Sequence, residues 1–281
     1  MNDPRLANPA GQQRFKPETR PFDPGTPHPA RVYNVWLGGK DAYAADRMAA
    51  AEVARCRPQV VAGARANRAF LARAVRYLAG QQGIRQFLDI GPGLPAPDAT
   101  HTVAQAIAPD SRIVYVDNDS IVLTHARALL VSTPQGACDY VYGDLRDPET
   151  ILKQASRTLD FSQPIAVILV AVLHFLPEAS DPQGIVATLA AALAPDSLLA
   201  ISHLTGDFAP EQVEAGVAAY NGLVSAPITP RSHAQVTALF GGLPLVAPGV
   251  VPVADWRPSR GPVRGISADV YAGVATTRRP R

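Results

Sequence analysis

Three aspartates stand at the ends of three successive apolar segments of this 281-residue chain. Asp89 lies within FLDIGPGLPAP, Asp117 ends RIVYVD, and Asp144 lies within VYGDL. Carboxylates attract cations and accept hydrogen bonds from hydroxyl and amino groups. Because the carboxyl ends of parallel strands meet at one edge of a sheet, this pattern predicts a common binding site for a ligand that carries such groups.

The loop after the first of these segments contains two glycines, Gly91 and Gly93, which let the backbone approach a ligand closely. On its own it is also consistent with a plain Gly-Pro turn. The letters GPGLPA match the dinucleotide pattern G-x-G-x-x-G/A. That pattern places backbone N–H groups against a pyrophosphate, and Pro92 and Pro95 have no N–H. Asp89 would also repel an anionic ligand.

A sulfonium cofactor reverses the sign of this argument, because S-adenosylmethionine carries a positive sulfur and an ammonium group that Asp89 attracts. Asp117 is placed to accept both hydroxyls of a ribose, a feature that dinucleotide enzymes share. Asp144 is placed to accept a hydrogen bond from the adenine amino group while Leu145 packs on the ring. The carboxylates favour S-adenosylmethionine, and NAD remains the alternative that GPGLPA and Asp117 alone would suit.

These side chains need a framework of alternating strands and helices. Strands are expected at Gln86–Ile90, Arg112–Asp117, a short segment ending at Tyr140–Gly143, Ile165–Leu173, Ser197–Ser202, Leu243–Val253 and Val270–Ala275. Helices are expected at Ala99–Ile107, Ile121–Leu130, Pro148–Gln154, from the Asp181-Pro182 cap to Leu193, and from a capping box at Ser232 to Phe240. Repeated βα units predict an α/β fold with a doubly wound, mostly parallel sheet that helices cover on both faces.

The domain organisation follows from composition. Residues 1–29 are rich in proline and poor in large apolar side chains, which predicts a mobile tail, with a tail folded over an active site as the second interpretation. Residues 30–85 show only helical periodicity and predict an N-terminal helical cap. Residues 86–277 form the sheet domain, and residues 278–281 end the chain as a frayed basic tail.

Composition also excludes several function classes. A net charge of +2 provides no strong field for nucleic acid or an anionic membrane. The longest apolar run, IAVILVAVL, is far shorter than the roughly 20 residues of a bilayer span. Two distant cysteines and six scattered histidines predict neither a disulfide nor a metal site. No nucleophile elbow, Walker loop or H-E-x-x-H pair occurs, so we expect none of those chemistries and no metal. The two distant cysteines fit a reducing compartment, and we expect a cytoplasmic protein.

The motif series as a whole resembles a known family. FLDIGPGLP, VYVDND, GDLRDP and AVLHFLP are similar to the successive motifs of class I S-adenosylmethionine-dependent methyltransferases. The resemblance is closer to a bacterial subfamily of S-adenosyl methyltransferases with the motifs RVYNxxLGGKD, ANRAFL, DIGxGLP and VLHF, and it extends from Ala30 to the C-terminus. It implies a seven-stranded Rossmann-like sheet whose last strand is antiparallel. Pro95 replaces a glycine of many class I enzymes, and the subfamily shares this proline.

The resemblance implies further cofactor contacts. Lys40 in LGGKD and Arg68 in ANRAFL are the candidates to meet the cofactor carboxylate, and arginine offers the bidentate geometry. Asn118 beside the second strand and Ala171 in the AVLH segment complete the predicted cofactor contacts.

Two histidines are the candidates for a general base. His174 and His203 each follow an apolar strand at its carboxyl end, where a histidine is either a proton acceptor or a structural residue held by hydrogen bonds. The segment after the fourth strand reads AVLH and lacks the N/D-P-P-Y/F motif of enzymes that methylate base amines. By elimination we expect a small-molecule acceptor, bound among the helical cap, this segment and the Thr205–Ile228 region. A protein that binds the cofactor without catalysis is the alternative, and the sequence leaves the methylated atom and the oligomeric state open.

Overall fold

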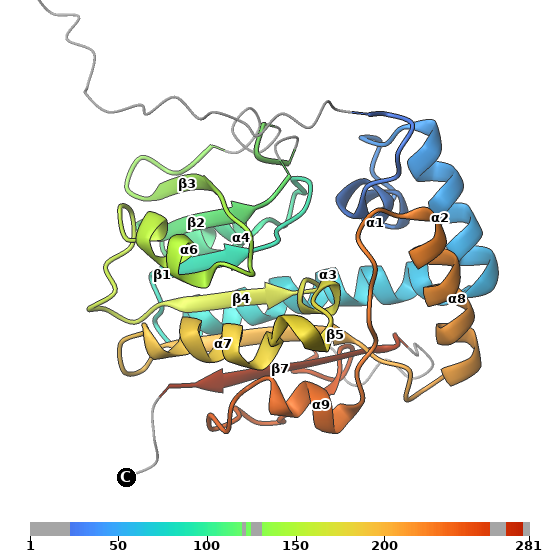
Figure 1. Ribbon diagram of the computed structural model, residues 1–281. Helices are drawn as coiled ribbons and strands as arrows, with labels where there is room; N and C mark the ends of the chain where they lie inside the picture. Colours follow the sequence, from blue (N-terminus) through green and yellow to red (C-terminus); the bar gives the residue numbers. More distant parts are fainter. Residues whose placement is uncertain (1–22, 120–121, 125–130, 259–267, 278–281) are drawn as a thin grey trace, which may run out of the picture.

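A seven-stranded sheet lies at the centre of the computed structural model. The structure describes residues 23–119, 122–124, 131–258 and 268–277 (Figure 1). The strands are β1 (Gln86–Ile90), β2 (Arg112–Asp117), β3 (Ala137–Tyr142), β4 (Ala166–Val170), β5 (Leu198–Leu204), β6 (Val251–Pro252) and β7 (Val270–Thr276). Their order is β3-β2-β1-β4-β5-β7-β6. β1 to β5 pair in parallel, whereas β7 runs antiparallel to β5 and to β6. The predicted α/β fold class is confirmed.

Helices cover both faces of this sheet, because successive side chains of a strand point to opposite faces. Leu88 and Ile90 of β1 pack in one core with α6 (Pro148–Ala155), α7 (Pro182–Ala191) and α9 (His233–Ala238). Phe87 packs in a second core on the other face, with α3 (Val60–Arg76) and α4 (Thr100–Ile107). Burial on both faces explains why the central strands read as continuous apolar runs.

A helical cap lies beyond the ends to which the arrows of β2 and β4 point (Figure 1). It contains α1 (Pro29–Leu37), α2 (Ala44–Cys56), the start of α3 and α8 (Pro210–Leu223), which share a third apolar cluster. The last of these, α8, comes from the region whose conformation the sequence did not predict. The cap is therefore assembled from the N-terminal helices and a helix that follows β5.

The long helix α3 connects the cap to the sheet. An apolar stripe of this helix is buried, with Phe70, Leu71, Ala74 and Val75 in α3 and Leu78 in the π-helical turn Tyr77–Gln81 that continues it. This stripe packs on the same face of the sheet as α4. α3 thus holds its N-terminal half against the cap and its C-terminal half against the sheet.

The predicted N-terminal tail includes residues that have a defined structure. Residues 23–28 form a turn and the N-cap of α1: the Asp23 carboxylate accepts hydrogen bonds from the Gly25 N–H and the Thr26 hydroxyl, and His28 caps the helix. The Nη2 atom of Arg31 donates to the Thr26 carbonyl at 2.7 Å. The remaining parts of the two predicted tails, residues 1–22 and 278–281, lie outside the described residues.

Two predicted strands were too long. β4 ends at Val170 rather than Leu173, because Ala171 has a φ of 56° and a 3-10 helix follows over Leu173–Phe175. Most of Leu243–Val253 is irregular, with prolines at 244 and 248 that cannot donate to a ladder, so only β6 and one bridge from Leu245 pair with β7. The predicted helix Ile121–Leu130 lies mostly outside the described residues.

The predicted helix caps are confirmed. The Asp181 carboxylate accepts from the Gly184 N–H at 2.9 Å at the start of α7, and Ser232 and Gln235 form a capping box at the start of α9. Within the described part of the chain, none of the helices combines the length and apolarity that a membrane crossing requires.

Candidate cofactor and acceptor site

A cavity of about 950 Å³ lies between the carboxyl ends of the parallel strands and the cap. Most of the residues singled out in the sequence line it: Arg68, Asp89, Gly91, Gly93, Asp117, Asn118, Asp144, Leu145, Ala171, His174 and His203. Lys40 is exposed and does not line this cavity, so the structure does not bring it together with the others. Ligands of doubly wound sheets bind at this edge.

Asp89 is the penultimate residue of β1, and it is only 3% exposed. Its Oδ2 atom accepts a hydrogen bond from the Thr100 hydroxyl on α4 at 2.6 Å. Burial raises the pKa of Asp89 to about 6, while the hydrogen bond from Thr100 and the charge of Arg68 act in the opposite direction. A buried carboxylate with so few partners is a favourable position for a ligand cation.

Asp117, at the end of β2, is a second carboxylate with a raised pKa. Burial raises the pKa of its carboxyl group to about 7, although hydrogen bonds from the backbone N–H groups of Asp119, Gly93 and Asn118 lower it. The Asp119 N–H lies 2.9 Å from its Oδ1 atom. Hydroxyl donors of a bound ribose would favour the charged form of Asp117 in the same way.

The glycine loop follows the backbone of β1 into the cavity. The Gly91 N–H donates to the Val116 carbonyl at 2.8 Å, and its φ of 76° lies in the left-handed region. A Cβ on Gly91 would stand 2.6 Å from the Cγ2 atom of Val172, so any side chain at this position would force Val172 to move. Gly93 also has a positive φ, of 67°, but open space around it. Gly91 is required by packing and conformation, Gly93 by conformation alone.

Leu145 and Asp144, the predicted adenine contacts, differ in how free they are to meet a ligand. The Leu145 side chain is buried at the cavity wall. The Asp144 carboxylate is bound closely by the neighbouring Arg146 side chain, so an adenine amino group would share it with that arginine. Asn118 is exposed at the rim.

Arg68 lines the cavity, as predicted for a residue that meets the cofactor carboxylate. Its Nε atom pairs with Asp98 at 2.7 Å, and that carboxylate is 38% exposed. The pair leaves the other guanidinium nitrogen atoms of Arg68 for a second carboxylate.

A chain of hydrogen bonds that the sequence did not predict connects the cap to Ala171. The Tyr33 hydroxyl donates to the Ala64 carbonyl at 3.1 Å and accepts from Asn67 Nδ2 at 3.0 Å. Asn67 Oδ1 accepts from the Ser202 hydroxyl at 2.6 Å, and Ser202 Oγ accepts from the Ala171 N–H at 3.0 Å. The RVYN and ANRAFL motifs thus hold the residue with positive φ at the end of β4.

The two histidines have different environments. The Nδ1 atom of His203 lies 2.7 Å from the Leu204 carbonyl, which fixes its proton there, and Nε2 accepts from Arg231 Nη1 at 2.8 Å. Burial lowers the pKa of His203 to about 4. Both nitrogen atoms are engaged, so His203 serves as a structural residue.

His174 stands on the 3-10 helix after β4 and faces the cavity. Its Nδ1 atom is enclosed and has no hydrogen-bond partner, so Nε2 is the atom that a bound molecule can reach. Burial, followed by the neighbouring His203 and Arg231, lowers the pKa of His174 well below its ordinary value. The ring is therefore neutral near pH 7.

Arg231 fixes the segment that carries His174. Its guanidinium donates to the carbonyls of Leu173 and Leu176 as well as to His203, and its Nε atom pairs with Glu178 at 2.7 Å. Its position before α9 gave no sequence signal, because the contacts join parts of the chain about 50 residues apart.

The half of the cavity beyond His174 has an apolar wall. The lining residues from the cap and the neighbouring loops are Trp36, Val53, Val60, Phe175, Val217, Tyr220 and Ile228. On the other side the described N-terminal segment closes the rim, where His28 Nδ1 lies 3.1 Å from the Asp119 carboxylate. The cavity therefore has a charged half beside β1 and β2 and an apolar half beneath the cap.

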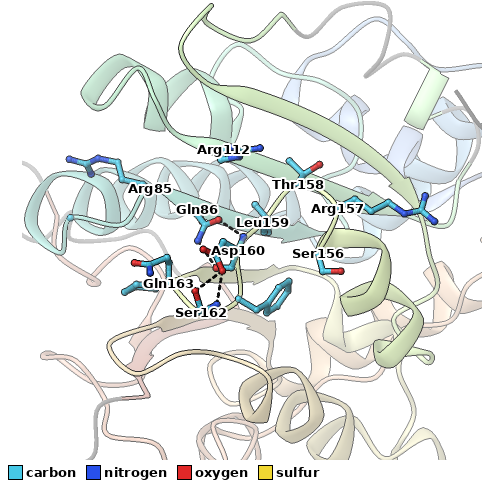
Figure 2. Close-up of a pocket in the computed structure, with 13 residues that line it drawn as sticks. Arg85, Gln86, Arg112, Ser156, Arg157, Thr158, Leu159, Asp160, Ser162 and Gln163 are labelled. Atoms are coloured by element: carbon cyan, nitrogen blue, oxygen red, sulfur yellow. Dashed lines mark hydrogen bonds between the residues drawn. The ribbon is translucent and has the colours of Figure 1, made fainter. Parts of the chain in front are cut away.

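A second cavity, of about 830 Å³, lies at the opposite edge of the sheet (Figure 2). Gln86 and the backbone of Asp160 exchange hydrogen bonds of 2.7 and 2.9 Å there, and the Asp160 carboxylate accepts from Ser162. Its central polar groups thus satisfy one another. In neither cavity do the described residues gather three or more side chains that could hold a metal ion.

A doubly wound sheet with a partly charged cavity at the carboxyl ends of its strands defines the class of cofactor-binding α/β proteins. The family model described as "S-adenosyl methyltransferase" matches residues 16–278, and the chain belongs to this family. It is therefore an S-adenosylmethionine-dependent methyltransferase, and the buried Asp89 and half-buried Asp117 carboxylates fit that cofactor. The cofactor of this family is S-adenosylmethionine rather than NAD.

Solved bacterial structures agree with this assignment. A DUF574 family protein from Streptomyces avermitilis is 42% identical, with a TM-score of 0.86 over 91% of this chain and 98% of its own. A Thermobifida fusca protein described as a candidate methyltransferase is 40% identical, with a TM-score of 0.84 over 91% of this chain and 96% of its own. No curated protein sequence matches the chain.

Proposed function

We propose that this methyltransferase acts on a small molecule that binds in the apolar half of the cavity, beneath the cap. The observation that carries the proposal is the continuity of one cavity from Asp89 and Asp117 to His174 and the apolar wall. A cofactor held by the carboxylates and an acceptor held by the cap would share this cavity. Bringing two reactants together in this way supplies much of the catalysis of a group transfer.

The charged half supplies the groups that would hold the cofactor. Asp117 would accept hydrogen bonds from the ribose hydroxyls, and Asp89 would offset the positive charges of the ammonium and sulfonium groups. Leu145 would pack on the adenine ring, and Arg68 would bind the carboxylate beside Asp98. When bound, S-adenosylmethionine supplies an activated methyl group, which passes to the acceptor by in-line displacement and leaves S-adenosylhomocysteine.

His174 would receive the proton that the acceptor loses. Its low pKa makes it a weak base, which is sufficient when the proton becomes strongly acidic as the acceptor atom gains a methyl group. The accessible Nε2 atom would accept this proton, and Arg231 keeps the supporting segment in place. The neutral ring would also orient a hydroxyl or N–H group before the transfer.

An activity measurement with a small-molecule extract tests the proposal. The purified protein is incubated with S-adenosylmethionine and a protein-free bacterial metabolite extract, and S-adenosylhomocysteine is measured by mass spectrometry. We expect the extract to raise its production above the extract-free rate, and Asp117→Ala to abolish the increase. Cofactor binding without any increase would identify a binding protein instead.

A further inference from the structure

We propose that Arg57 anchors the acceptor through an oxygen atom, so that the acceptor class is a largely apolar molecule with a carbonyl or carboxylate group. This inference rests on the proposed function, because it assigns the apolar half of the cavity to the acceptor. It names a residue that stood in none of the sequence motifs.

Arg57 is a buried cation at the wall of that half. It caps the C-terminus of α2, is 6% exposed and lines the cavity. Its Nε atom donates to Oδ2 of Asp269 at 2.9 Å, and Asp269, which precedes β7, is itself buried. The ion pair joins the cap to the sheet edge and keeps the guanidinium in one orientation.

The ends of this guanidinium remain available. Neither Nη atom of Arg57 donates a hydrogen bond to any residue in the described ranges. The buried polar side-chain atoms that lack a hydrogen-bond partner do not include either Nη atom, so both are accessible. Arg57 also lines the cavity. A guanidinium has five N–H donors in a planar fork that matches the two oxygens of a carboxylate or a single carbonyl.

The surrounding backbone makes room for Arg57. Gly216 of α8 is buried against it, and a Cβ at this position would stand 2.8 Å from the Cβ atom of Arg57. Asp269 holds its carboxylate toward Arg57 with a φ of 34°, in the left-handed region that side chains rarely adopt. Burying an ion pair costs desolvation that the attraction of the two charges barely offsets, so stability alone is a poor reason for this arrangement.

The neighbours of Arg57 define the rest of the acceptor. His174 is close enough for the Arg57 charge to contribute to its lowered pKa. Apolar and aromatic side chains, including Trp36 and Tyr220, also line the cavity. An acceptor that spans the site would present an oxygen to Arg57, its methylated atom to His174 and an apolar body to the cap. Because Asp269 offsets the charge of Arg57, the guanidinium can bind either a neutral carbonyl or a carboxylate.

Probe binding to the protein saturated with S-adenosylhomocysteine tests this inference. The probes are 1-naphthamide, 1-naphthoate and 1-methylnaphthalene, which share an apolar body and differ in the oxygen-bearing group. Binding is measured by ligand-detected NMR titration. We expect the amide or the carboxylate to bind roughly tenfold or more tightly than the hydrocarbon, the range of hydrogen bonds to charged groups. The stronger of the two identifies the group.

Variants of Arg57 separate anchoring from folding. Arg57→Lys keeps the charge but loses the fork, and Arg57→Met combined with Asp269→Asn removes both charges so that neither is left unpaired. We expect both variants to bind S-adenosylhomocysteine within twofold of the wild type and to lose the preference for oxygen-bearing probes. Gly216→Ala, which displaces Arg57 without removing it, should weaken the same preference.

The outcomes distinguish this inference from the proposed function. A wild-type protein that fails to bind S-adenosylhomocysteine contradicts the proposed function. Normal binding of S-adenosylhomocysteine, with equal affinity for all three probes or an unchanged preference in the Arg57 variants, overturns the role of Arg57. Failure of both oxygen-bearing probes to bind the wild type overturns it as well.

Discussion

The carboxylates of Asp89 and Asp117 stand where they destabilise the protein without a ligand. Asp89 is almost completely removed from water and Asp117 partly so, and in each burial is the main cause of the raised pKa. A carboxylate in such a place gains from a bound cation or hydroxyl donor more than an exposed one would. Cofactor affinity and stability without ligand therefore oppose each other at these positions.

The cost of burying the Asp89 carboxylate predicts that Asp89→Asn changes the free energy of unfolding in a pH-dependent way. The folded pKa of about 6 exceeds the ordinary value of 3.8, so the folded state binds the proton more strongly and stability falls as pH rises from about 4 to about 6. Asn cannot ionise, and it still accepts from Thr100. The variant should gain about 1–3 kcal/mol of unfolding free energy at pH 8 and little at pH 4. Urea unfolding at both pH values measures this, and a variant less stable than the wild type at pH 8 contradicts it.

His174→Gln tests proton acceptance at the same scale. Because His174 lines the cavity but is not among the residues proposed to hold the cofactor, we expect cofactor affinity within twofold of the wild type. Turnover should fall by about 100-fold, the lower end of what a positioned base contributes. Steady-state release of S-adenosylhomocysteine with an active extract fraction provides the measurement. Unchanged turnover would leave His174 with no role in proton transfer.

At the scale of elements, the loop between β1 and α4 offers a matched pair of substitutions. Gly91→Ala adds both the strain of a positive φ and a clash with Val172, whereas Gly93→Ala adds strain alone. We expect Gly93→Ala to cost about 1 kcal/mol and Gly91→Ala at least about 2 kcal/mol more, with a larger loss of cofactor affinity. Thermal unfolding and calorimetry compare them. Equal effects of the two would contradict the close approach of the loop to Val172.

The hydrogen-bond chain from the cap to Ala171 predicts a coupled loss of stability and affinity. Ser202→Ala leaves Asn67 Oδ1 buried without its donor and Ala171 without one acceptor, which costs about 1–3 kcal/mol. Cofactor affinity should fall several-fold because Ala171 is held less firmly. Ser162→Ala, an exposed serine at the opposite edge of the sheet, is the control. Unchanged affinity of the Ser202 variant would show that Ala171 needs no such support.

Sequence patterns predicted the elements well where local chemistry decides them. β1 and β2 have the predicted residues, since both are apolar runs bounded by loops. The strand predicted at β4 was too long because the apolar residues continue past Ala171. Only tertiary contacts change the direction of the chain there. The segment Leu243–Val253 is apolar enough for a strand, yet its prolines prevent most of the pairing.

Across the whole molecule, the residues of the candidate site also fall into those that the sequence could predict and those that it could not. Asp89, Asp117, Gly91 and Gly93 were predictable because strand ends of a doubly wound sheet converge, whatever the details of packing. Lys40 was expected in the cavity from its motif and lies outside it. Arg57 and the Tyr33–Asn67–Ser202 chain required the structure, since their partners lie up to 212 residues away and no local pattern marks them.

The most direct test of the account is a calorimetric titration of the purified protein with S-adenosylmethionine, S-adenosylhomocysteine and NAD, repeated on Asp89→Ala and Asp117→Ala. The predicted result is saturable binding of the two sulfur ligands and none of NAD. Each substitution should weaken that binding roughly tenfold or more, as expected for the loss of a charged hydrogen-bond partner. Binding of NAD alone, or binding of the sulfur ligands that neither substitution affects, would contradict the assignment of this cavity.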